Sequence, residues 1–218
     1  MRDYFKRVVK LLFGIFLFSF GIVLTMQANV GLAPWDAFHV GLSNITGMSF
    51  GNVVFWVGLI VLLITVLLGE KIGIGTILNV VLSGYFCDLI LELRVIPLME
   101  STWLGLVMMI FGLFIISFAS YFYISSAFGA GPRDALMIGL KKKLPRVPVG
   151  FVRGIIEGAV LLLGWLMGAK IGLGTVIAAF GIAFTIQLTF SAMKFDVDQV
   201  QNEDLLDTLR AIKTVRQQ

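Results

Sequence analysis

Two acidic residues occupy the same place in a short stretch that the chain contains twice. The copies are GLAPWDA at positions 31–37 and GAGPRDA at positions 129–135, and they carry Asp36 and Asp134. Each aspartate stands two residues after a proline, which suits the first position of a helix. A carboxylate there can cap the helix by accepting from its free N–H groups. It can equally line a cavity and bind a cation or a proton, as at the broken helices of transporters, and both interpretations are open.

The residues beside the two aspartates differ in chemistry. Trp35 precedes Asp36, and its ring can stack on an apolar or cationic ligand. Arg133 precedes Asp134, where it can attract an anion to a helix N-terminus or extend to lipid headgroups as a flank residue. His39 follows Asp36 by one helical turn, and it can share a proton or a ligand with that carboxylate or simply pack. These five residues form the first part of the candidate site.

A charged pair breaks the symmetry of the repeat. Arg153 and Glu157 stand four residues apart in an apolar run, where the first half of the chain has Val54 and Gly58. One charge inside the hydrocarbon costs about 2.5 to 3.5 kcal/mol on insertion scales, so Glu157 should face the bundle and find a partner. Arg153 is the nearest candidate by helical spacing. The two residues either complete the binding site or form a structural ion pair.

The residue types exclude most enzyme chemistry. One cysteine and one histidine rule out a disulfide framework and a zinc site of Cys/His type. No Ser/His/Asp set or hydrolase carboxylate pair emerges from the spacing, and the Gly-x-Gly turns are too short for a nucleotide loop. We therefore predict a protein that is not an enzyme and that has no cofactor and no metal. The net charge of +4 arises in helix flanks, so we expect no nucleic-acid binding.

The elements that must position these residues are membrane helices. The chain of 218 residues is 58% hydrophobic and 14% charged, and its mean hydropathy is +0.97. That composition is typical of a polytopic membrane protein in contact with the lipid bilayer. Residues 29–46 and 132–140 are too short and too polar to span, so each is predicted to form a half-helix. The fold class is all-α with six transmembrane helices, predicted at Leu11–Ala28, Gly51–Leu68, Ile74–Leu91, Trp103–Tyr123, Gly150–Met167 and Gly172–Met193.

The two halves of the chain are copies of each other. The first repeat covers about residues 11–93 and the second about 103–193, within one transmembrane domain at 1–193. Because each repeat has three spans, the second copy should lie upside down relative to the first, as an inverted repeat. The residues expected to build the repeated motif and its turns are Gly31, Pro34, Gly129, Gly131, Pro132, Lys71, Gly73, Lys170 and Gly172.

Some roles follow from position alone. The repeated lysines, Lys71 and Lys170, are expected to anchor tight turns at lipid headgroups, and Gly73 and Gly172 to need a positive φ. Tyr123, at the end of the fourth span, is expected in an aromatic belt.

Basic residues orient the chain. The N-terminal flank has four Lys and Arg, the region 129–148 has five and the tail at 194–218 has four, whereas the loop at 29–51 has none. The positive-inside rule therefore places both termini in the cytoplasm. The tail turns polar and carries leucines at helical spacing, which predicts a short amphipathic helix.

The repeated Gly-Pro-Asp motifs and the Lys-Ile-Gly-x-Gly-Thr turns resemble those of the YczE/YitT group of bacterial integral membrane proteins. The likeness extends to about Met193, and the absence of a soluble C-terminal domain makes YczE the closer match. This resemblance implies a multi-pass protein of the bacterial inner membrane without a settled activity. The residues that carry it are Gly31, Pro34, Trp35, Asp36, Gly129, Gly131, Pro132, Arg133, Asp134, Lys71, Gly73, Lys170 and Gly172.

Two functions compete at this point. The first is a small transporter or facilitator of an unknown small solute or ion, with its site between two re-entrant half-helices. The second is a membrane scaffold or regulatory subunit that acts through the basic loop at 141–146 and the tail. A homo-oligomer or a membrane partner fits either one.

Overall fold

The computed structural model describes residues 2–129, 131–196, 200 and 203–204, and all regular secondary structure in that part of the chain is helical. Six helices are long and apolar enough to span a membrane, which confirms the predicted all-α polytopic fold. Five begin and end within two residues of the predicted bounds, whereas α1 begins nine residues earlier. The helices are α1 (Arg2–Gln27), α2 (Pro34–Thr46), α3 (Phe50–Leu67), α4 (Ile74–Leu93), α5 (Thr102–Ile124), α6 (Pro132–Lys143), α7 (Val149–Leu166) and α8 (Leu173–Ala192).

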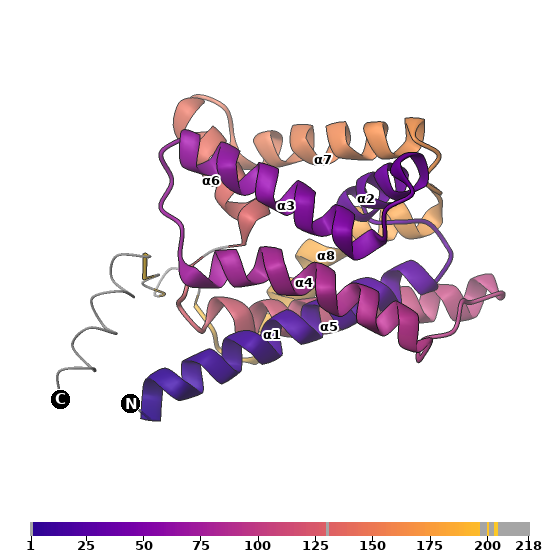
Figure 1. The fold of residues 1–218 in the computed structure, drawn as a ribbon, viewed down its shortest axis with the longest axis horizontal. Helices are drawn as coiled ribbons and strands as arrows, with labels where there is room; N and C mark the ends of the chain where they lie inside the picture. Colours follow the sequence, from indigo (N-terminus) through magenta and orange to yellow (C-terminus); the bar gives the residue numbers. More distant parts are fainter. Residues whose placement is uncertain (1, 130, 197–199, 201–202, 205–218) are drawn as a thin grey trace.

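Helices α1 and α5 pack along each other in opposite directions (Figure 1). A Cβ atom on Gly14 would lie 2.8 Å from the backbone nitrogen of Tyr123, and one on Gly112 would lie 2.8 Å from the Thr25 side chain. Both members of the first contact match members of the second across the 98-residue offset, so the two contacts are equivalent. Small residues let the helix backbones approach closely. Helix α4 packs on α1, and α8 packs on α5 in the same way.

The two predicted half-helices are present as α2 and α6. Both begin at a proline in the first turn, and the C-cap residue of α2, Gly47, has the left-handed conformation. Helix α6 runs to Lys143, three residues beyond the predicted end. With 13 and 12 residues and a rise of 1.5 Å per residue, they are about 20 and 18 Å long. Neither crosses a hydrocarbon layer about 30 Å thick.

Each half-helix packs on the other half of the chain. Helix α2 lies against α7, and α6 lies against α3. The loops that lead into them are held in equivalent ways, since Gly174 N–H donates to the Val30 carbonyl and Gly75 N–H donates to the Phe128 carbonyl, both at 2.8 Å. Each repeated turn therefore positions the half-helix of the opposite repeat.

The predicted reason for two of the turn glycines was wrong. Gly73 and Gly172 have φ values of −95° and −167°, which any residue can adopt. Glycine stands there because a Cβ atom would collide with the carbonyl oxygen of Phe128 or of Val30. Within these turns the positive φ values occur at Gly69 and Gly168 (both 86°), and in the half-helix motifs at Gly31 (120°) and Gly129 (113°).

The repeated lysines, expected at lipid headgroups, also contact the protein itself. Lys170 Nζ donates to Asn29 Oδ1 at 2.6 Å, and so ties the α7–α8 turn to the loop before α2. Lys71 Nζ lies 2.9 Å from Asp204 Oδ2 in the tail.

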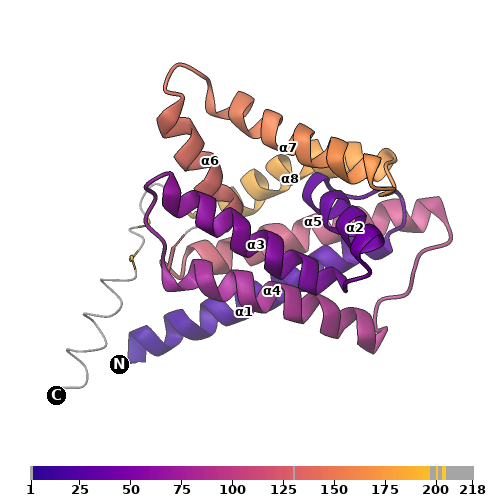
Figure 2. The same ribbon diagram turned by 45° about the horizontal axis from the view of Figure 1, so that its top comes forward.

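The connections gather at two opposite ends of the bundle (Figures 1 and 2). One end carries the start of α1, the end of α8 and the α3–α4 and α6–α7 connections. The other carries the α2–α3, α4–α5 and α7–α8 connections. The lysines at 141–143, which end α6, lie at the first end, and the last turn of α2 lies at the second. The grouping of loops therefore matches the one derived from the basic residues.

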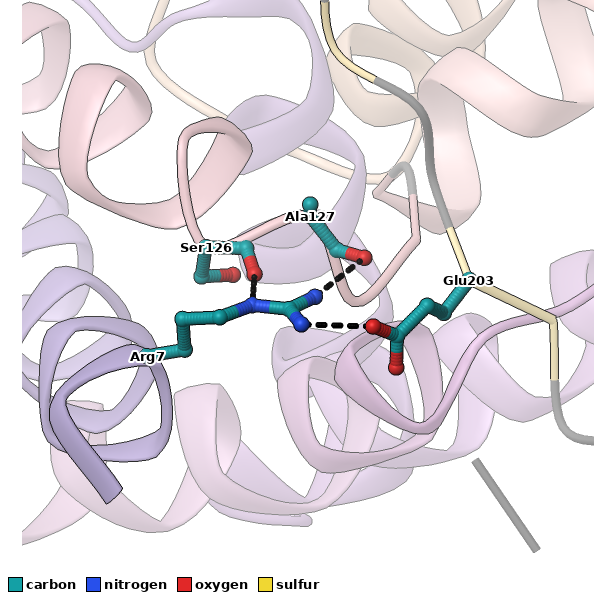
Figure 3. Close-up of polar contacts among 4 residues, drawn as sticks. All are labelled: Arg7, Ser126, Ala127 and Glu203. Carbon is teal, nitrogen blue, oxygen red and sulfur yellow. Dashed lines mark hydrogen bonds and ion pairs between the residues drawn. The ribbon is translucent and has the colours of Figure 1, made fainter. Parts of the chain in front are cut away.

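Arg7 joins the described part of the tail to the α5–α6 loop (Figure 3). Its guanidinium donates to the Ser126 carbonyl at 2.9 Å and pairs with Glu203 at 2.5 Å. The Glu203 N–H donates to the Ala127 carbonyl at 2.9 Å. The amphipathic helix predicted for the tail falls mostly on residues outside the described part of the chain.

Candidate functional site

The N-terminal ends of the two half-helices meet at a pair of adjoining internal cavities, of about 90 and 180 Å³. Trp35 from α2 and both Arg133 and Asp134 from α6 line both of them. The Arg133 guanidinium carbon lies 4.9 Å from the centre of the Trp35 ring, as in a cation–π contact. Trp35 and Arg133, which occupy equivalent positions in the two motifs, therefore contact each other. This contact is direct evidence that the half-helix ends converge.

Asp36 faces the larger cavity from a buried position, with 4% of its surface exposed. Its Oδ1 atom has no hydrogen-bond partner in the described structure. The N-cap residues of the two half-helices are Ala33 and Gly131, which have no side-chain acceptor. The unpaired oxygen favours the ligand interpretation of Asp36 over the capping one, because a buried carboxylate oxygen without a donor is costly.

Asp134 differs from its counterpart in its surroundings. It keeps solvent-accessible surface because it borders both cavities. The two equivalent aspartates therefore stand in unequal environments, one enclosed and one open to the cavity.

Arg153 and Glu157 form the predicted pair, with 2.8 Å between Arg153 Nε and Glu157 Oε1. Both line the larger cavity with Asp36. Their side chains are 45% and 23% exposed, which fits a position on the cavity wall better than one in a sealed core. Helix α7 thus brings two charges to the half-helix ends.

His39 lines the smaller cavity and Asp36 the larger one, and Trp35 borders both. It is 1% exposed, its Nδ1 has no hydrogen-bond partner among the described residues, and its ring packs edge-on against Phe50 at 5.8 Å. The packing interpretation therefore describes its ring, while the unpaired nitrogen stays available to a ligand or a water molecule.

The electrostatic character of the site is mixed. The cavities bring together three carboxylates and two guanidinium groups, so acids exceed bases by one when all are ionised. Most of the remaining wall is apolar, with Phe18 and Ile22 of α1 shared by both cavities. Charges interact strongly in such low-dielectric surroundings, so the balance among these five groups is sensitive to a bound ion.

Sequence reasoning missed two residues. Tyr123, predicted in an aromatic belt, is 7% exposed and lines the smaller cavity. Asp88 accepts a hydrogen bond from Gly51 N–H at 2.6 Å and from Ser49 Oγ at 2.5 Å, and so joins α4 to the start of α3. Ser49 directly before an apolar run was a readable helix-cap signal. Its partner on α4 was not readable, because it depends on the packing of two helices.

The comparisons with known proteins agree with the fold. A model of a "Family of unknown function (DUF6198)" matches residues 5–191. The chain belongs to this family. It is 32% identical to the uncharacterized membrane protein YczE of Bacillus subtilis over 76% of this chain and 77% of that protein.

Two further relatives match over similar lengths. An uncharacterized protein of Haemophilus influenzae is 28% identical, over 84% of this chain and 83% of its own. The uncharacterized protein YyaS of Bacillus subtilis is 26% identical, over 75% and 82%. No solved structure matches the chain. The resemblance to YczE is therefore confirmed, and the function has to be argued from the residues.

Proposed function

We propose that this protein is a small transporter or facilitator of the cell membrane, with its site where α2 and α6 meet. One observation carries the proposal: two half-helices from equivalent repeats direct their N-terminal ends at one internal cavity lined by five charged side chains. Secondary transporters place their sites in this way, at the interface of repeats and between discontinuous helices.

The charged residues support a transported or coupled ion. Asp36 has an enclosed oxygen without a donor, and Asp134 borders the cavity. Charges at membrane depth are costly, so a protein retains them chiefly where they line a pathway. Both termini lie in the cytoplasm of a bacterial cell in this proposal, as the basic residues at that end of the bundle predict.

The scaffold alternative receives less support. Lys141 Nζ donates to the carbonyls of Pro145 and Val147, and Lys142 pairs with Glu70 at 2.8 Å. Two of the basic groups of the loop thus have partners within the chain.

Flux through the purified protein tests the proposal. Proteoliposomes are examined by solid-supported-membrane electrophysiology against a panel of inorganic cations, amines, carboxylates and neutral solutes, and by an internal pH dye. We expect a current or proton flux that Asp36→Asn and Asp134→Asn each abolish while the fold is retained. Glu100→Gln, at an exposed acid of the α4–α5 loop, is the matched control. A folded protein that is silent across the panel, and that captures one stoichiometric partner from membranes, would replace transport with the scaffold function.

A further inference from the structure

The seam between α3 and α4 is closed by direct backbone contact. A Cβ atom on Gly51 would collide with the carbonyl oxygen of Gly84, and one on Gly84 with that of Gly51. Asp88 then fastens the seam by accepting from Gly51 N–H and Ser49 Oγ, which puts a negative charge at the N-terminus of α3. This contact lies at the end of the bundle that carries the α2–α3 connection.

The equivalent seam in the second repeat is open. The counterparts of Gly51, Gly84 and Asp88, 99 residues later, are Gly150, Ala183 and Gln187. Helices α7 and α8 are described over their whole lengths, yet they scarcely touch each other. A Cβ atom on Gly150 would have no neighbour within 4 Å, and the same is true of the glycines one and two turns later, at 154 and 158.

The larger cavity occupies this opening. Ile156 and Glu157 of α7 and Ala179 and Ile182 of α8 are among its walls. Its α7 wall lies in the first half of that helix and its α8 wall in the middle of α8. The start of α7 lies at the end of the bundle opposite to the start of α3, where the closed seam is fastened (Figure 1). The two repeats therefore differ in one specific respect, because one seam is closed and the equivalent seam gives access to the charged site.

We propose that the two seams are alternating gates, and that the chain can exchange the conformations of its repeats. In the exchanged state α7 packs on α8, with its three glycines against Ala179 and Ala183, while α3 separates from α4. Gln187 then takes the place of Asp88 and accepts from Gly150 N–H. This inference rests on the proposed function for its purpose, but its content is conformational and can be tested without a substrate.

Three features support the exchange. Glycine and alanine on facing helices allow backbones to approach, so the open seam has the residues that closure requires. The Arg153–Glu157 pair borders the opening, and charges facing a permanent gap filled by lipid would be costly. A groove with a mostly apolar lining, to which Asn52 and Asp88 also contribute, already follows the α3–α4 seam, where a second entrance would form. Packed interfaces switch between discrete arrangements of this kind.

Distances across both seams test the proposal in lipid nanodiscs. Spin labels are placed in a Cys87→Ala background at Asn52 and Tyr85 for the closed seam, and at the equivalent residues Phe151 and Phe184 for the open one. All four side chains are exposed. Pulsed electron spin resonance should show two distance populations at each pair, and the population that is short at 151–184 should be long at 52–85.

A substitution of Asp88, which fastens the closed seam, tests the direction in which the two populations shift. Asp88→Asn should shift the ratio of the two populations about tenfold toward the exchanged state, because a charge-assisted bond contributes on that order. Glu92→Gln removes the same charge one turn further along α4, where no described hydrogen bond reaches α3, and should leave the ratio unchanged.

Three results would overturn the exchange. The first is a single fixed distance at 151–184 in both variants, and the second is an equal shift with Glu92→Gln. The third is a distance signal from protein labelled only at position 184, because it would mean that a second copy of the chain fills the opening. Silent flux assays with moving gates would refute the proposed transport and leave the gates standing. Flux together with unchanging distances at both seams would support the proposed transport and refute the gates.

Discussion

Removing the charges of Arg153 and Glu157 one at a time and together should show that they stabilise each other. At 2.8 Å between Nε and Oε1, the gross attraction is about 6 kcal/mol at an effective dielectric constant of about 20. Most of it is offset, because the two side chains are 45% and 23% exposed to the cavity and both lose hydration on pairing. We therefore expect a coupling free energy of about 1 kcal/mol.

The measurement is a double-mutant cycle with Arg153→Met, Glu157→Gln and the double variant. The free energy of unfolding is obtained by titration with a denaturing detergent in mixed micelles. Arg153→Met alone should be the most destabilising, since it leaves Glu157 without a partner, and the double variant should be about 1 kcal/mol more stable than the sum of the two single effects predicts. Single effects that add to within about 0.3 kcal/mol would show that the two residues do not interact, and would refute the reasoning from the structure.

Three further predictions concern the repeats. Gly51→Ala should destabilise the protein by about 1 to 3 kcal/mol, because its Cβ meets the Gly84 carbonyl, whereas Gly150→Ala at the equivalent position should be neutral within about 0.5 kcal/mol. Equal effects in thermal unfolding would contradict the unequal seams. A topology reporter fused after Asn44 should read outside the cytoplasm and one after Lys143 inside it, and the same side for both would mean that the half-helices span. Gln187→Asp should strengthen closure of α7 on α8 and raise the short-distance population at 151–184, and a change in the opposite direction would exclude Gln187 as the counterpart of Asp88.

The sequence predicted the helices and the convergence of the half-helices because those features depend on local pattern and internal repetition. Apolar runs bounded by glycine and proline located the spans, and the copied motif indicated that Asp36 and Asp134 occupy equivalent places. The pairing of Arg153 with Glu157 followed from helical spacing and the cost of a lone charge. The structure places all of these charged residues on the walls of two adjoining cavities.

The errors and omissions share a physical cause, because each concerns contacts between distant elements. Gly73 was assigned to backbone conformation, but its neighbour is the Phe128 carbonyl of the other repeat. Lys170 was expected at lipid headgroups, and its hydrogen bond to Asn29, which is 141 positions away, could not be read from its place in the turn. Tyr123 stands at the end of a span, where an aromatic belt is the usual expectation. It lies instead on the face that α5 turns toward the cavity.

The difference between the two seams has a chemical basis in the places where the copies diverge. Asp88 supplies a charged acceptor and Ser49 a hydroxyl donor at the closed seam, whereas the second repeat has the neutral amide of Gln187 and Pro148, which has no hydroxyl. A charge-assisted bond is about twice as strong as a neutral one, so α3 is held to α4 more firmly than α7 can be held to α8. The same divergence puts Arg153 and Glu157 on α7, so the seam that opens is also the one that carries charge toward Asp36. Thus the repeated residues give the chain two equivalent arrangements, and the diverged residues set which of them is favoured.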